Sequence, residues 1–141
     1  MKQTLLIITA LMLVVGFSNA QTHKGMEFYE NGEPKSIKTY KVSKDKIELV
    51  KKVSWYSSGQ KYKEGTFKDG KEDGKWTSWH NNGQKYIEET YKDGVLDGLW
   101  KFWYENGKSG EATFKDGEFI TAECWDEDGN EEDCPSWIYE E

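Results

Sequence analysis

The chain of 141 residues is long enough for one domain and too short for two. From Gln21 onward it carries 18 lysines, no arginine and 26 acidic residues, a net charge of −8. A net acidic surface without arginine is poorly suited to phosphate backbones or to anionic lipid headgroups. These counts argue against nucleic-acid binding and against membrane-surface binding.

The first twenty residues have the pattern of an export signal. Lys2 precedes an apolar run from Thr4 to Phe17, and Ser18-Asn19-Ala20 supplies a small-x-small cleavage pattern. The run is short for a membrane span, and no stop-transfer pattern follows it. We therefore predict a signal peptide over 1–20, a mature domain over 21–141, and a periplasmic, cell-surface or secreted location without membrane insertion.

The mature chain is poor in aliphatic residues and rich in aromatic ones. Twenty of its 37 apolar residues are Trp, Tyr or Phe, and fifteen are Ala, Val, Ile, Leu or Met. Aromatic area must therefore provide most of the packing. Thirteen glycines indicate frequent turns, so the composition predicts an all-β protein.

A short motif recurs five times along the chain. Each copy is an aromatic residue, three mostly turn-forming residues and a glycine, as in Trp79-His-Asn-Asn-Gly83 and Trp103-Tyr-Glu-Asn-Gly107. The five glycines are Gly32, Gly59, Gly83, Gly107 and Gly129. A second motif, Thr-aromatic-Lys-Asp-Gly, recurs between them and ends at Gly70, Gly94 and Gly117. Such regularity indicates a repeat protein.

Each unit is predicted to be a β-hairpin, because Asn-Gly and Asp-Gly favour turns with positive φ. A two-residue turn at Asn82-Gly83 would place Trp79 opposite Tyr86, with Trp76, Ile87 and Tyr91 on the other face. The same spacing places Trp55 opposite Tyr62. The unit after Gly107 is one residue shorter, and we expect a bulge or a different turn type there.

The motifs resemble the MORN-repeat variant family, including its bacterial YwqK-type antitoxin-like members. The segments Gly74 to Gln84 and Gly98 to Lys108 carry the resemblance, which extends over about Glu27 to Asn130. It implies an elongated single antiparallel sheet of about four to five tandem hairpin units. Residues 21–54 lack the Lys-Asp-Gly motif and are predicted to form a divergent N-terminal unit.

Cys124 and Cys134 are the only cysteines, and they lie five residues on either side of Gly129. A three-residue loop would set them opposite each other, so a structural disulfide is predicted in an exported chain. The alternating oxygens of Asp126, Asp128, Asn130 and Glu132 could suggest calcium, but Glu131 replaces the glycine of a calcium loop. A solvated acidic turn is preferred, and neither metal nor cofactor is predicted.

No set of residues suits acid–base or nucleophilic catalysis, so the protein is predicted not to be an enzyme. His80 takes the place of Tyr56 and Tyr104 in the repeat and is interpreted as a surface variant. The remaining candidates are aromatic rows that could bind a partner if one row stays exposed; their members are Trp55, Trp76, Trp79, Trp100, Trp103 and Tyr104.

The function predicted is a protein–protein interaction module, with an antitoxin or immunity-like protein as one form of it. A basic protein would suit the acidic surface. The alternatives are a glycan-binding module and a structural component of the cell envelope. Pairing of the sheet ends with another copy stays open, since an exposed edge strand invites it.

Overall fold

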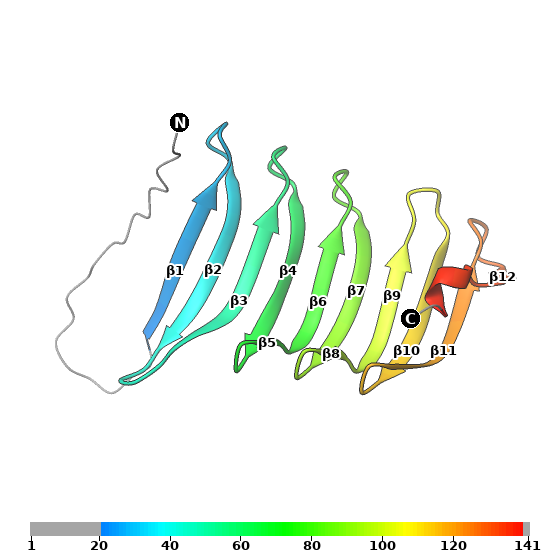
Figure 1. The fold of residues 1–141 in the computed structure, drawn as a ribbon. Coiled ribbons are helices and arrows are strands. Elements are labelled where there is room, and N and C mark those ends of the chain that lie inside the picture. The colour runs from blue at the N-terminus through cyan, green and yellow to red at the C-terminus, as the bar shows by residue number, and fades with distance from the viewer. Residues whose placement is uncertain (1–20, 140–141) are drawn as a thin grey trace.

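The computed structural model describes residues 21–139, and the predicted signal peptide lies outside them. The chain forms one open antiparallel sheet of twelve strands, with the hairpins side by side in a row (Figure 1). The strands are β1 (Gln21–Phe28), β2 (Pro34–Val42), β3 (Ile47–Trp55), β4 (Lys61–Lys68), β5 (Lys71–Glu72), β6 (Gly74–Trp79), β7 (Lys85–Lys92), β8 (Val95–Leu96), β9 (Gly98–Trp103), β10 (Ser109–Lys115), β11 (Glu118–Trp125) and β12 (Glu131–Glu132). A 3-10 helix, η1 (Ser136–Ile138), follows. The predicted all-β repeat fold is confirmed.

All five aromatic motifs form the same turn, at the upper edge of the sheet in Figure 1. In the third, His80 N–H donates to the Gln84 carbonyl (2.8 Å) and Gly83 N–H donates to the His80 carbonyl (3.0 Å). Gly83 has φ +84°, a value that glycine adopts readily. The loop is therefore three residues long, and the predicted two-residue turn is wrong.

The loop changes the pairing at the hairpin tip but not along its body. Ser78 lies opposite Ile87 as predicted, so Trp76, Ile87 and Tyr91 do share one face. A bulge between Ser78 and Trp79 then sets Trp79 opposite Lys85 rather than Tyr86. Another such bulge sets Trp55 opposite Lys61 rather than Tyr62. The three-residue loop shifts the pairing at the hairpin tip by one residue, and the bulge restores the predicted register along the body. The predicted aromatic pairs at the tip are therefore wrong.

The shorter unit after Gly107 keeps the same turn and lacks the bulge at the hairpin tip. Tyr104 N–H donates to the Lys108 carbonyl at 2.8 Å, as in the other units. Trp103 then pairs with Ser109 and Phe102 with Gly110 in unbroken register. The residue missing from this unit is the one that forms the tip bulge in the other hairpins. The turn type does not change, and the predicted bulge is found further along the unit, between Thr113 and Phe114, where β10 pairs with β11.

The Lys-Asp-Gly motifs form two-residue turns at the opposite edge of the sheet. Both turn residues have positive φ in each case, as at Asp93 (52°) and Gly94 (89°). Neighbouring turns are joined by backbone hydrogen bonds, from Gly94 N–H to the Glu72 carbonyl (2.9 Å) and from Gly117 N–H to the Leu96 carbonyl (2.8 Å). Each unit is thereby fixed to the next at the turn as well as along the strands.

The two faces of the sheet differ in character. We call one the polar face; it carries a row across the strands formed by Glu64, Thr77, Glu88, Lys101, Glu111 and Glu123. The other, the aromatic face, carries Trp76, Trp100 and Phe102. The buried cluster lies on the aromatic face at the C-terminal end, where Phe102, Ala112 and Cys124 contact Ile138 of η1. Four partly buried aromatic residues pack against this cluster: Trp100, Tyr104, Phe114 and Phe119.

The N-terminal unit differs from the others in the connection between β2 and β3. A loop closed by a hydrogen bond from Ser43 N–H to the Lys46 carbonyl (2.9 Å) replaces the Asp-Gly turn between β2 and β3. Ser36 is the one fully buried residue of β1, β2 and β3. Across residues 21–139, no helix has the length and apolar character needed to cross a bilayer.

Cys124 and Cys134 form the predicted disulfide, with Cα atoms 5.2 Å apart. Their placement differs from the prediction. The loop spans 127–129, so Cys124 lies opposite Glu132 rather than Cys134. The chain leaves the sheet after Glu132, and the disulfide ties this departing segment and η1 to β11.

Candidate interaction surfaces

In the first three motifs, the residue after the repeat aromatic links one hairpin to the next. The side chains of Tyr29 and Tyr56 donate to the carbonyls of Trp55 and Trp79, both at 2.8 Å. His80 Nε2 lies 2.9 Å from the Trp103 carbonyl and takes the same role. Because a carbonyl only accepts, this contact requires the proton on Nε2. His80 is thus partly buried and structural rather than a plain surface variant.

The candidate aromatic residues fall into two rows on opposite faces. Trp55, Trp79 and Trp103 lie half-buried on the polar face, next to the aromatic-motif turns. Lysines from the preceding hairpin cover two of these rings: Lys61 Nζ lies 4.8 Å from the Trp79 ring centre, and Lys85 Nζ lies 6.0 Å from that of Trp103. Cation–π contacts of this kind hold the row in place and leave part of each ring accessible.

Trp76 is only 4% exposed, so its ring presents no contact surface. It lies across Gly65, where a β-carbon would come within 2.0 Å of its Cδ2 atom. Its Nε1 donates to the Thr66 carbonyl at 3.1 Å. The repeat spacing gives Trp76 and Trp100 the same position, and the structure places Trp76 in the packing of the sheet.

Trp100 and Tyr104 lie half-buried at the C-terminal end of the aromatic face. The ring of Trp100 packs edge-on against Trp137 at 5.7 Å, and Tyr104 packs against Phe102 at 5.6 Å. Trp137 is itself 45% exposed. Sequence reasoning missed Trp137 because it lies outside the repeats; its position after the disulfide was the one available signal.

An open groove of about 310 Å³ lies beside these rings. Its walls combine aromatic rings with polar groups from the turn between β9 and β10 and from the C-terminal segment. The lining includes Phe102, Tyr104, Asn106, Lys108, Glu132, Asp133 and Trp137. Rings beside carboxylates form a surface that suits a cationic group.

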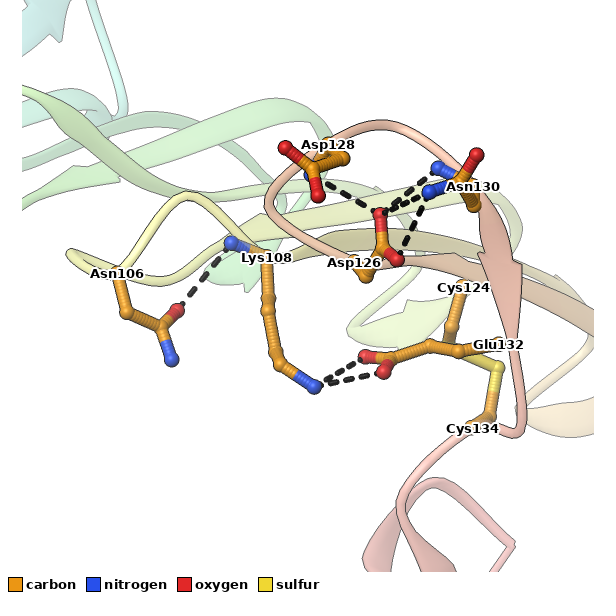
Figure 2. A network of polar contacts seen from close by, with 8 residues as sticks. All are labelled: Asn106, Lys108, Cys124, Asp126, Asp128, Asn130, Glu132 and Cys134. Carbon is orange, nitrogen blue, oxygen red and sulfur yellow. Dashed lines mark hydrogen bonds and ion pairs between the residues drawn. A yellow bond between two sulfur atoms is a disulfide. The ribbon is translucent and has the colours of Figure 1, made fainter.

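A polar network holds the wall of this groove (Figure 2). Lys108 Nζ contacts both carboxylate oxygens of Glu132, at 2.9 and 2.6 Å. This contact raises the pKa of Lys108 above its ordinary value. Asp133 is exposed and forms no ion pair with another residue of 21–139.

The neighbouring acidic turn is held by Asp126 (Figure 2). Its Oδ1 accepts from the backbone N–H groups of Asp128 (3.0 Å) and Asn130 (2.8 Å), and Oδ2 accepts from Asn130 Nδ2 (3.1 Å). The bonds from Asn130, side chain first and then backbone, lower the pKa of Asp126, and the bond from Asp128 adds to this. The carboxylate thus organises the turn instead of pointing into solvent.

Charge is strongly segregated along the row of hairpins. Residues 21–68 contain eleven lysines and six acidic residues, a net charge of +5. Residues 98–139 contain three lysines and eleven acidic residues, a net charge of −8. The overall negative charge therefore belongs to the C-terminal half, where the groove lies.

Comparison with known proteins identifies the repeats. Three segments, 24–41, 72–93 and 96–116, match the model of the MORN repeat variant. They fall on β1–β2, on β5–β7 and on β8–β10, so one match lies inside the unit that the sequence analysis treats as divergent. No curated protein and no solved structure matches the chain. In these three segments the chain is similar to the MORN repeat variant, and each segment lies in the row of hairpins of one antiparallel sheet.

Proposed function

We propose that this protein is a non-enzymatic, exported interaction module that binds a basic protein through its acidic C-terminal half. The observation that carries the proposal is the open groove between Tyr104, Trp137 and Asp133. MORN-variant repeats are consistent with an interaction role, since the stacked hairpins form a scaffold on which such a surface is fixed. An antitoxin or immunity-like protein is one form that such a binder would take.

The groove suits a lysine or arginine side chain of the partner. The exposed ring of Trp137 offers a cation–π contact, and the unpaired Asp133 carboxylate offers an ion pair. The net charge of −8 in this half would draw a basic protein from a distance and accelerate association. Such binding weakens as salt rises, because salt screens exposed charges.

Export is supported by two separate features. Residues 1–20 have the pattern of a signal peptide. The Cys124–Cys134 disulfide is compatible with an oxidising compartment, where such bonds persist. N-terminal sequencing of envelope material tests this part; a chain still starting at Met1 would contradict it.

The binding proposal is tested by affinity capture. The purified protein is the bait, envelope and secreted fractions are the prey, and mass spectrometry identifies what is retained at low and high salt. We expect a basic protein that is lost at high salt. Retention of polysaccharide or cell-wall material alone, insensitive to salt, would replace the proposal with glycan binding or a structural role.

Matched variants locate the contact. Asp133→Lys and Trp137→Ala should each abolish capture, because they remove the carboxylate and the exposed ring of the groove. Glu118→Lys makes the same charge change at the other end of β11, outside the groove lining, and should retain most of the binding. Equal losses for Asp133→Lys and Glu118→Lys would show that general charge, not the groove, attracts the partner.

A further inference from the structure

The N-terminal edge of the sheet is open along a whole strand. β1 pairs only with β2 within residues 21–139, and Figure 1 shows it at the end of the row. All eight of its residues are exposed. An edge strand of this length is a ready template for a further strand.

The direction of the free backbone groups follows from the turn. Tyr29 N–H donates to the Glu33 carbonyl at 2.9 Å, so the backbone of Tyr29 points toward β2. Backbone groups alternate in direction along a strand. The pairing of β1 with β2 runs from Gln21 to Glu27 without interruption, and the unpaired bulge residue, Lys35, belongs to β2. The N–H and C=O groups of four residues therefore point outward: Thr22, Lys24, Met26 and Phe28.

The side chains of these four residues share the polar face. Met26 and Phe28, near the turn, are apolar and 54% and 56% exposed. Lys24 lies at the other half of the strand, and Lys41 of β2 lies directly beside Thr22. Both lysines are exposed, and neither forms an ion pair with another residue of the described chain. The edge thus has an apolar half and a basic half on one face.

The charge around β1 indicates which kind of strand this edge binds. The surrounding residues 21–68 have a net charge of +5. A second copy joined edge to edge would bring two basic ends together, and like charges at an interface oppose binding. An acidic strand has the complementary charge.

We propose that β1 binds an extended acidic segment of another protein as an additional antiparallel strand. Apolar side chains of that segment pack beside Phe28 and Met26, and its carboxylates lie beside Lys24 and Lys41. From N- to C-terminus the segment has two apolar residues followed by two acidic residues, each separated by one residue. This site goes beyond the proposed function, since it lies at the opposite end of the molecule and takes a partner of opposite charge.

The test uses the peptide Val-Thr-Val-Thr-Glu-Thr-Glu, capped at both ends and labelled, with fluorescence anisotropy on the purified protein. We expect saturable binding that weakens with salt. Peptides with Gln or Lys in place of both Glu residues should bind more weakly, the Lys peptide by about tenfold or more. Equal binding of the Glu and Lys peptides would overturn the proposal.

Two variants at one position isolate the backbone contact. Met26→Pro removes an outward N–H and leaves the hydrogen bonds between β1 and β2 in place. Met26→Thr removes the same side chain and keeps the N–H. Binding of the Glu peptide should fall by about tenfold or more in Met26→Pro relative to Met26→Thr. Equal affinities would overturn the proposal.

Lys24→Glu gives a test that does not depend on how β1 tolerates proline. This variant should bind the Lys peptide in preference to the Glu peptide, and an unchanged preference would overturn the proposal. Sedimentation identifies the competing occupant: a dimer that Met26→Pro dissociates would assign the edge to a second copy and overturn the assignment to an acidic segment. Asp133→Lys should leave peptide binding unchanged. The peptide experiment therefore tests the site at β1 independently of the proposed function at the groove.

Discussion

The two ends of the sheet differ in how they are covered. At the N-terminal end, β1 offers eight exposed residues and a backbone edge that no other strand of residues 21–139 pairs with. At the C-terminal end, the last strand is two residues long, a disulfide follows it, and Ile138 is buried against Phe102. A stacked repeat buries its surface only against its neighbours, so a terminal unit needs a cap. One end of this protein has that cap and the other end has a free edge.

The largest effect is expected from removing the disulfide. Replacing Cys124 and Cys134 together by alanine releases the C-terminal segment from β11. Closing a loop of this length contributes about 3 kcal/mol in the chain-entropy description. We expect the free energy of unfolding, measured by urea denaturation with tryptophan fluorescence, to fall by about that amount. Met26→Thr at the open edge is the control and should change it by less than about 0.5 kcal/mol.

A glycine in the interior should respond differently from one at the edge. Gly65→Ala places a β-carbon 2.0 Å from Trp76, so the ring must move, at a cost of about 1–3 kcal/mol. Gly25→Ala in β1 meets only the Tyr40 ring at 3.6 Å, an ordinary contact. Thermal unfolding should show a lower midpoint for Gly65→Ala alone. Similar shifts for both would contradict the contrast between interior and edge.

The tyrosine links allow a smaller comparison between neighbouring units. Tyr56→Phe removes the hydroxyl that donates to the Trp79 carbonyl and should cost about 1 kcal/mol. Tyr29→Phe removes the same bond at the open end. Terminal elements open locally more readily than central ones, so we expect Tyr29→Phe to accelerate hydrogen exchange in β1 and β2 with little change in global stability. Equal global losses would show that β1 unfolds only with the whole sheet.

The smallest effect concerns acid at the capped end. The pKa of Asp126 is lowered in the folded turn, so its stabilising contribution is present above the unfolded pKa of about 3.9 and is lost as pH falls through the folded value. Exchange of the Asp128 and Asn130 amides should therefore accelerate as pH is lowered below about 4, beyond the intrinsic change in exchange rate. Asp126→Asn should remove this pH dependence, and an unchanged dependence would assign it to another carboxylate.

Much of the fold follows from local sequence. The parts that do not follow depend on loop length and on the register between hairpins. Asp-Gly predicts turns with positive φ, and the Lys-Asp-Gly turns have positive φ at both residues. Asn-Gly is compatible with two- and three-residue loops, and the tip pairing of Trp79 depends on which one forms. Contacts across units, such as His80 with the Trp103 carbonyl, require the register of two hairpins at once.

The candidate surfaces were the least predictable part. Repeat spacing treats Trp76 and Trp100 alike, while burial depends on what faces each ring: Gly65 for Trp76 and the C-terminal segment for Trp100. Trp137 has no counterpart in the repeats, so no pattern points to it. The division of charge is visible in the sequence. It separates two surfaces of opposite charge only because the two halves of the chain lie at opposite ends of the row of hairpins.

The lateral order of the hairpins also fixes how the molecule would respond to mechanical force. Strands joined side by side separate one after another when the free edge is pulled, so a load on the N-terminus would peel β1 away first. Successive motif glycines such as Gly59, Gly83 and Gly107 are 24 residues apart, so each repeat released adds about 80 Å of extended chain. The segment between Cys124 and Cys134 adds no such length while its bond is intact. A force–extension trace would therefore show one step of this length for each repeat released from the N-terminal end. The disulfide-closed segment at the C-terminal end would add no step.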